Sequence, residues 1–134
     1  MSGQNITSGG VTTQVILADT IVPHLESMAN CDNCTIGSLA CDLIAVGYEK
    51  LVDRTFIENP EDVFQELVTL VDAWFPTSVT KLMIHIDQRL NVRIRSTAKE
   101  QDMTDAEINS LCLVYGYQLR TQSVTQVDKS FFDE

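Results

Sequence analysis

Residues 36–55 read IGSLACDLIAVGYEKLVDRT and form the longest uninterrupted helical pattern in the chain. Apolar side chains recur there at three- and four-residue steps, which places them along one face of a helix. These residues are Ile36, Leu39, Ala40, Leu43, Ile44, Gly47 and Leu51. A second face carries the small residues Gly37, Cys41 and Ala45, at a spacing that lets another backbone approach closely. Because a helix that is apolar on most sides is usually buried on most sides, we expect it to form the core or the seam between two copies.

The composition indicates one acidic globular domain. The chain has 134 residues, of which 44% are hydrophobic, enough for a real core. It carries 9 Lys and Arg against 19 Asp and Glu, a net charge of −10. Such acidity disfavours general binding to nucleic acid, because phosphate contacts need Lys and Arg. Residues 77–98 differ, since they hold four bases and one acid and form a basic island that can steer an acidic partner or another copy.

No targeting or membrane signal is visible. The start MSGQNITSGG has neither the basic region nor the apolar region of a secretion signal. No apolar run is long enough to span a bilayer. We therefore expect a cytoplasmic protein with no membrane partner, whose four cysteines stay reduced.

The two ends of the chain are polar and bound the expected domain. We expect a flexible arm over residues 1–10, a single domain over 11–122 and a polar tail over 123–134. From Val11 to about Met28 the apolar spacing predicts a helix. Pro23 interrupts this pattern and predicts a kink or a restart of the helix near that position.

Three further helices are marked by capping signals. Thr35 is placed to cap the 36–55 helix. Asn59 precedes a proline and two acidic residues, which predicts a helix over 60–75 with a buried apolar stripe. Thr104 and Glu107 form a capping box that opens the last helix.

Residues 79–96 change from helical to alternating periodicity. Apolar residues fall on one parity and polar residues on the other, a pattern typical of strands. We therefore predict a β-hairpin that turns at residues 87–89, although Leu82, Ile86, Leu90 and Ile94 are also spaced as in a helix. The predicted fold is α+β, with four helices and one hairpin in the order α-α-α-β-β-α.

One group of residues has a spacing that suits a metal. His24, Cys31, Cys34 and Cys41 form the pattern H-x6-C-x2-C-x6-C, and a C-x2-C pair can close on Zn²⁺. A reduced structural pair at a helix start explains the same pattern and is favoured. A redox motif is a third interpretation, but the strand that precedes thioredoxin-like motifs is missing. We expect no cofactor, with zinc as the alternative.

No catalytic constellation stands out, and an enzyme is disfavoured. The two histidines lie apart from any nucleophile pattern, and no phosphate-binding glycine loop is present. We predict a small, acidic, non-enzymatic adaptor or assembly protein that binds protein, most simply another copy of itself. The predicted partner-binding residues are Lys81, Arg89, Arg93, Arg95, Phe131 and Phe132.

Two other functions stay open. The order of elements is similar in outline to winged-helix DNA-binding proteins, with the basic hairpin as the wing. The helix before that hairpin has acids and no base, so phosphate would be repelled, and nucleic acid is the less favoured partner. A zinc or redox protein that uses Cys31 and Cys34 is the third hypothesis.

Overall fold

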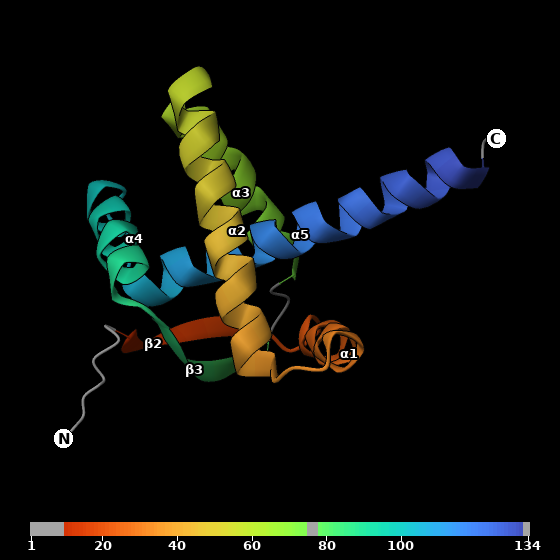
Figure 1. Cartoon of the computed structure of the whole chain (residues 1–134). Coiled ribbons are helices and arrows are strands. Elements are labelled where there is room, and N and C mark those ends of the chain that lie inside the picture. The colour runs from red at the N-terminus through yellow and green to blue at the C-terminus, as the bar shows by residue number, and fades with distance from the viewer. Residues whose placement is uncertain (1–9, 75–77, 133–134) are drawn as a thin grey trace.

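The structure is a computed structural model that describes the backbone of residues 10–74 and 78–132 and the side chains up to residue 122. It is α+β, as predicted, and contains seven elements in its described part (Figure 1). They are β2 (Gly10–Ala18), α1 (Val22–Asp32), α2 (Ile36–Ile57), α3 (Pro60–Trp74), β3 (Val79–Asp87), α4 (Gln88–Glu100) and α5 (Asp105–Phe132). The described residues thus form five helices instead of four, and the first element is a strand.

The two strands pair with each other although they are far apart in sequence. β2 and β3 are antiparallel, with Gly10 opposite Asp87 and Ala18 opposite Val79. The predicted hairpin partner of β3 was wrong, because residues 88–96 are helical and residues 10–18 take their place in the sheet. A helix was expected over residues 11–18 from their apolar spacing. Pairing with a strand that is distant in sequence outweighs that local pattern.

Asp87 decides where β3 ends and α4 begins. Its side-chain Oδ2 accepts hydrogen bonds from the backbone N–H groups of Arg89 (3.0 Å) and Leu90 (3.3 Å). An aspartate that caps two free N–H groups in this way starts a helix. After Asp87 the apolar residues spaced by four therefore mark one face of a helix and not a strand. Ile94 lies on the buried side of α4.

The other helix boundaries follow their capping signals. Pro23 lies in the first turn of α1. It therefore marks the start of a helix, which is one of the two outcomes predicted for it, and does not kink a longer one. The hydroxyl of Thr35 accepts a hydrogen bond from the N–H of Ser38 at 3.1 Å, which caps α2. Thr104 and Glu107 bond to each other's backbone N–H groups and so form the predicted capping box at the start of α5.

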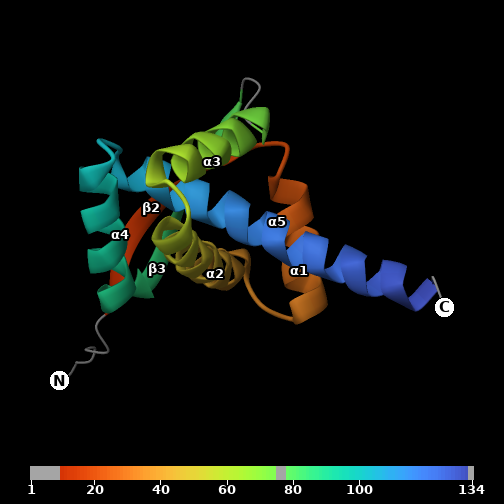
Figure 2. The same cartoon turned by 90° about the horizontal axis from the view of Figure 1, so that it is seen from above.

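The core lies where α2 crosses α5, above the two strands. Figures 1 and 2 show α2 running across α5, with β2 and β3 at one end of α2. The residues of the predicted stripe lie on the core side of α2, and all but the half-buried Ile36 are buried; Tyr48 is buried as well. From α5 the largest fully buried side chains are Ile108, Leu111 and Leu113. The helix over residues 36–55 therefore forms the core, as expected.

The close backbone contact of α2 is made by a different residue from those predicted. A methyl group added at Gly47 would collide with the backbone of α5, whereas one added at Gly37 would meet nothing within 4 Å. The expectation of a tight contact at Gly37, Cys41 and Ala45 was therefore wrong at Gly37 within one chain. Cys41 and Ala45 are half-buried.

The last helix continues past the rest of the molecule. α5 runs to Phe132, and its C-terminal part projects away from the other elements (Figures 1 and 2). The backbone over residues 123–132 is thus helical where a polar tail was expected. The side chains of Phe131 and Phe132 lie outside the described residues.

Candidate partner-binding groove

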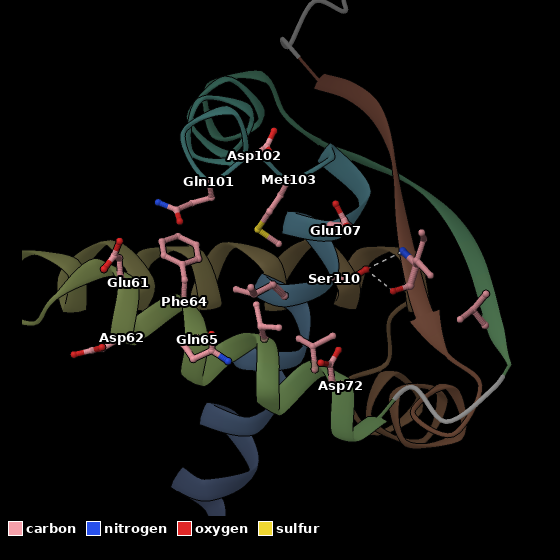
Figure 3. Close-up of a pocket in the computed structure, with 15 residues that line it drawn as sticks. Glu61, Asp62, Phe64, Gln65, Asp72, Gln101, Asp102, Met103, Glu107 and Ser110 are labelled. Atoms are coloured by element: carbon pink, nitrogen blue, oxygen red, sulfur yellow. Dashed lines mark hydrogen bonds between the residues drawn. The ribbon is translucent and has the colours of Figure 1, made fainter.

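A groove of about 930 Å³ lies between α3 and the segment that joins α4 to α5. Figure 3 shows α3 on one side of this groove, and β2 and the residues after α4 on the other side. Fifteen residues line it. We call it the acidic groove, for the reason given below.

The floor of the acidic groove is apolar. It is formed by Ile16, Phe64, Val68, Val71, Val79, Met103 and Leu111. Phe64 and Leu111 are buried and belong to the core, whereas Val79 is 49% exposed. An apolar floor of this kind gains free energy when a partner removes it from water.

The rim carries negative charge only. Its carboxylates belong to Glu61, Asp62, Asp72, Asp102 and Glu107, and the lining holds no Lys, Arg or His. Glu107 serves the capping box of α5. Within the described ranges, no ion pair or side-chain hydrogen bond engages the other four carboxylates. The groove therefore presents uncompensated negative charge around an apolar surface, which favours a cationic partner.

Local sequence explains the position of the rim. Asn59 Oδ1 accepts a hydrogen bond from the N–H of Glu61 at 2.9 Å, so α3 starts with two acids in its first turn. There they interact favourably with the positive end of the helix dipole. Asp102 has a φ of 57°, in the left-handed region, and lies within the short connection between α4 and α5.

Ser110 joins the groove to the sheet. Its Oγ accepts a hydrogen bond from the N–H of Ile16 at 3.1 Å and also donates to the carbonyl of Ile16 (Figure 3). Asn109 Nδ2 donates to the carbonyl of Gln14 at 2.9 Å. These bonds hold the edge of β2 that faces away from β3 against α5. The hydroxyl of Ser110 is therefore a structural group of the groove and is not placed as a nucleophile.

Three of the four predicted basic residues lie on a helix and not on the face of a hairpin. Arg89, Arg93 and Arg95 belong to α4, whereas Lys81 belongs to β3. All four are exposed. The prediction that strand parity places them on one face was therefore wrong, because the strand ends at Asp87.

The exposed side of α4 is nonetheless the most basic surface of the described chain. We call it the basic face; it consists of Arg89, Val92, Arg93, Arg95 and Lys99, all exposed. The guanidinium of Arg93 lies 5.4 Å from the centre of the Tyr48 ring, and Arg95 Nε lies 3.3 Å from Asp105 Oδ2. Arg95 still keeps 64% of its side chain exposed. The apolar Val92 is 58% exposed in the middle of these bases.

The residues proposed for zinc do not assemble. His24 packs edge-on against Trp74, with ring centres 5.8 Å apart. Cys31 is exposed, and Cys41 Sγ donates a hydrogen bond to the carbonyl of His85 at 3.0 Å. Among the side chains that the structure describes, no group of three or more His, Cys, Asp or Glu is arranged to hold a metal ion. The set of His24, Cys31, Cys34 and Cys41 is thus not a metal site in this structure.

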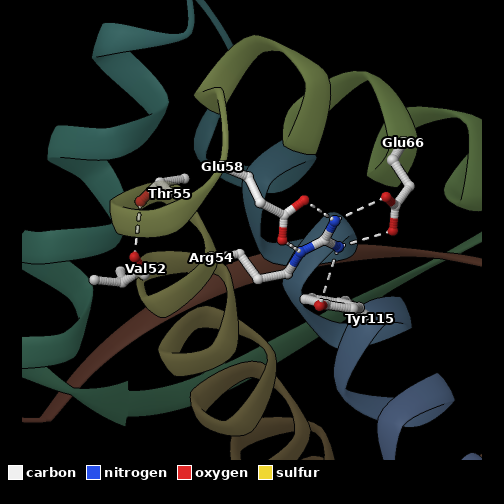
Figure 4. A network of polar contacts seen from close by, with 6 residues as sticks. All are labelled: Val52, Arg54, Thr55, Glu58, Glu66 and Tyr115. Atoms are coloured by element: carbon white, nitrogen blue, oxygen red, sulfur yellow. Dashed lines mark hydrogen bonds and ion pairs between the residues drawn. The ribbon is translucent and has the colours of Figure 1, made fainter.

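A polar network next to the core was not anticipated from sequence. Arg54 makes paired hydrogen bonds of 2.8 Å to both Glu58 and Glu66, and a longer one of 3.3 Å to Tyr115 (Figure 4). It joins α2, α3 and α5. These bonds raise the pKa of Arg54 and lower the pKa values of both glutamates. Only the spacing of four residues between Arg54 and Glu58 is visible in the sequence, so the network as a whole left no signal.

The groove itself was also missed, although one signal pointed to it. The helix over residues 60–75 contains acids and no base, a charge pattern that was interpreted from sequence as repelling phosphate. The second wall of the acidic groove comes from residues 101–103, which are distant in sequence from α3. Their approach to α3 depends on the crossing of α2 and α5, which no local pattern encodes.

Comparisons with protein-family models, with curated proteins and with solved structures find no match to this chain. Among the helices that the structure describes, each is too short or too polar to cross a membrane.

Proposed function

We propose that this chain is a small, acidic, non-enzymatic adaptor or assembly protein that binds protein through the acidic groove and acts as a homo-oligomer. The observation that carries the proposal is the combination of an apolar floor with a rim of carboxylates and no base. Apolar area supplies affinity for a partner, and a rim of one charge selects among partners and sets their orientation.

The polar groups of the groove support binding more than catalysis. Ser110 is engaged with the backbone of Ile16, and Glu107 caps α5. Neither histidine lines the groove. His24 lies in an aromatic cluster, and His85 Nδ1 is 3.4 Å from the hydroxyl of Thr12. The Ser110 hydroxyl thus has no histidine beside it in the groove.

A blocked groove tests the proposal. Val68→Arg places a long cation on the floor, where it fills space and pairs with the rim. Thr69→Arg is the matched control, because Thr69 is exposed on the same helix and does not line the groove. We expect the wild type to show a mass that rises with concentration in light scattering, the Val68→Arg variant to remain monomeric, and the control to behave as wild type.

Two outcomes would overturn the proposal. One is a wild type that stays monomeric at several hundred micromolar. The other is a folded Val68→Arg variant, with wild-type circular dichroism, that still associates as wild type does.

A nucleic-acid-binding regulator remains the second candidate, because α4 places four bases on one exposed helix. The wing that the sequence suggested is not formed, since residues 88–96 are helical. Fluorescence anisotropy with a single-stranded and a double-stranded oligonucleotide, measured across salt, addresses this candidate. A steep loss of affinity with salt would favour it over the adaptor.

A further inference from the structure

We propose that the occupant of the acidic groove is the basic face of α4 from a second copy of this chain. The inference rests on the proposed function and adds the identity of the partner surface. It makes each copy both a donor of a basic helix and an acceptor of one.

The acidic groove and the basic face are complementary in the arrangement of their apolar and charged groups as well as in the sign of their charge. The groove has an apolar floor inside a rim of four unengaged carboxylates. The basic face has the exposed Val92 inside a ring of four cations. Docking one on the other places Val92 on the floor and the guanidinium and ammonium groups against the rim. Both the apolar and the ionic contacts are then satisfied together.

No other described segment offers an equivalent ligand. Four of the nine bases of the chain lie in the 13 residues of α4. Arg54 and Arg120 are engaged in ion pairs with carboxylates of their own chain. By contrast, Arg89 and Lys99 have no ion pair or side-chain hydrogen bond to any described residue. Their charges are available to a second molecule.

The contact joins two molecules because α4 cannot reach its own groove. The side of α4 that carries Ile94 and Ala98 is buried against the body of the molecule, so the basic face points outward. Gln101, directly after α4, already lines the groove of the same chain. Turning the basic face into that groove would expose the buried side of the helix to water.

The size of the docking helix sets the expected strength of association. A helix of 13 residues is about 20 Å long, which gives an interface at the small end of the range and a weak, transient association. Charge pairs at an exposed rim weaken as salt screens them. We therefore expect association to be visible at low ionic strength and to decline with added salt. Because donor and acceptor are different surfaces, the contact can build chains or a closed ring.

Complementary variants test the proposal with the full chain. The donor variant, Arg89→Glu with Lys99→Glu, reverses the basic face. The acceptor variant, Glu61→Lys with Asp72→Lys, reverses the rim. Glu26→Lys with Asp53→Lys is the matched control, since both acids are exposed, lie outside the groove and give the same change in charge as the acceptor variant.

Sedimentation velocity at low salt gives the readout. Each variant alone should associate at least about tenfold more weakly than wild type, because like charges then face each other. A 1:1 mixture restores two complementary contacts: the reversed α4 of the donor variant meets the reversed rim of the acceptor variant, and the unchanged α4 of the acceptor variant meets the unchanged rim of the donor variant. The mixture should therefore form dimers and larger species as wild type does, whereas neither variant does so alone. The control should associate as wild type.

The outcomes separate this inference from the proposed function. If the donor variant associates as wild type while Val68→Arg is monomeric, the groove has another occupant and only the inference falls. If the mixture forms no dimer although each variant is folded, the inference falls as well. If the wild type is monomeric at several hundred micromolar, the homo-oligomer and the inference fall together.

Discussion

Gly47 of α2 and Gly116 of α5 lie at the same helix crossing, and each faces the backbone of the other helix. A methyl group at Gly47 would collide with the carbonyl of Cys112, and one at Gly116 would collide with the carbonyl of Leu43. In both cases the obstacle is backbone, which a rotamer change cannot relieve. The two glycines therefore set the distance between the helices that carry most of the core.

Alanine at Gly47 is expected to destabilise the fold. The added methyl forces α2 and α5 apart, so the free energy of unfolding should fall by about 1–3 kcal/mol. Gly37→Ala is the matched control on the same helix, because a methyl there meets open space and alanine favours a helix. Urea denaturation of both variants provides the measurement. Equal stability of the two variants would contradict the assigned close contact.

The Arg54 network predicts a loss of stability in acid. Hydrogen bonds from Arg54 hold the pKa values of Glu58 and Glu66 below their ordinary value of 4.5. Groups with a lowered folded-state pKa stabilise the fold above the unfolded pKa, and this contribution is lost as pH falls through the folded value. The melting temperature of wild type should therefore drop as pH falls below about 4.5.

An Arg54→Met variant isolates that effect. It should melt below wild type at pH 7, and the difference in melting temperature should narrow as pH falls, because protonation of the two glutamates removes their ion pairs with Arg54. Lys81→Met removes the same charge from an exposed site without this network and serves as the control. A gap that stays constant with pH would show that Arg54 acts through packing alone.

Ser110 is expected to matter for stability more than its place in the lining of a groove suggests. Ser110→Ala leaves the N–H and the carbonyl of Ile16 without their partner, at a cost of about 1–3 kcal/mol. Ser96→Ala, at an exposed position of α4, should be neutral. Amide hydrogen exchange gives a local readout, since the N–H of Ile16 should exchange faster in the Ser110 variant. An unchanged exchange rate at Ile16 would contradict the hydrogen bonds between Ser110 and the backbone of Ile16.

The four cysteines should react in a defined order. Cys31 is exposed, whereas burial raises the pKa of the Cys41 thiol and raises that of the fully buried Cys112 strongly. Less thiolate and less access both slow alkylation. Mass spectrometry after brief treatment with iodoacetamide at pH 8 should find Cys31 modified first and Cys112 last. In urea all four should label at similar rates, and early labelling of Cys112 in the folded protein would contradict its burial.

Helix boundaries were predictable because their causes lie within a few residues. Thr35, Asn59 and Thr104 each accept the hydrogen bond that their position implied. The α+β class followed from the same local patterns together with the alternation that begins at residue 79.

The errors arose where the deciding contact is distant or where two periods coincide. Residues spaced by four keep both the parity of a strand and one face of a helix, so Ile86, Leu90 and Ile94 did not separate the two structures. The cap supplied by Asp87 is what ends the strand and starts the helix. Residues 10–18 became a strand through a partner at residues 79–87, and the groove joins α3 to residues 101–103. Tertiary contacts of this kind leave no periodic trace in the chain.

The pairing of β2 with β3 also has a consequence for how the protein is made. A ribosome adds about 5–20 residues per second, so β2 leaves it several seconds before β3 exists. All of α1, α2 and α3 is synthesised between the two strands. During that interval the apolar Val15 and Leu17 have no strand to pair with, and α5, which covers them, comes later still. The nascent chain is therefore most vulnerable to misassociation at its N-terminal strand, and a chaperone that shields short apolar segments would act there.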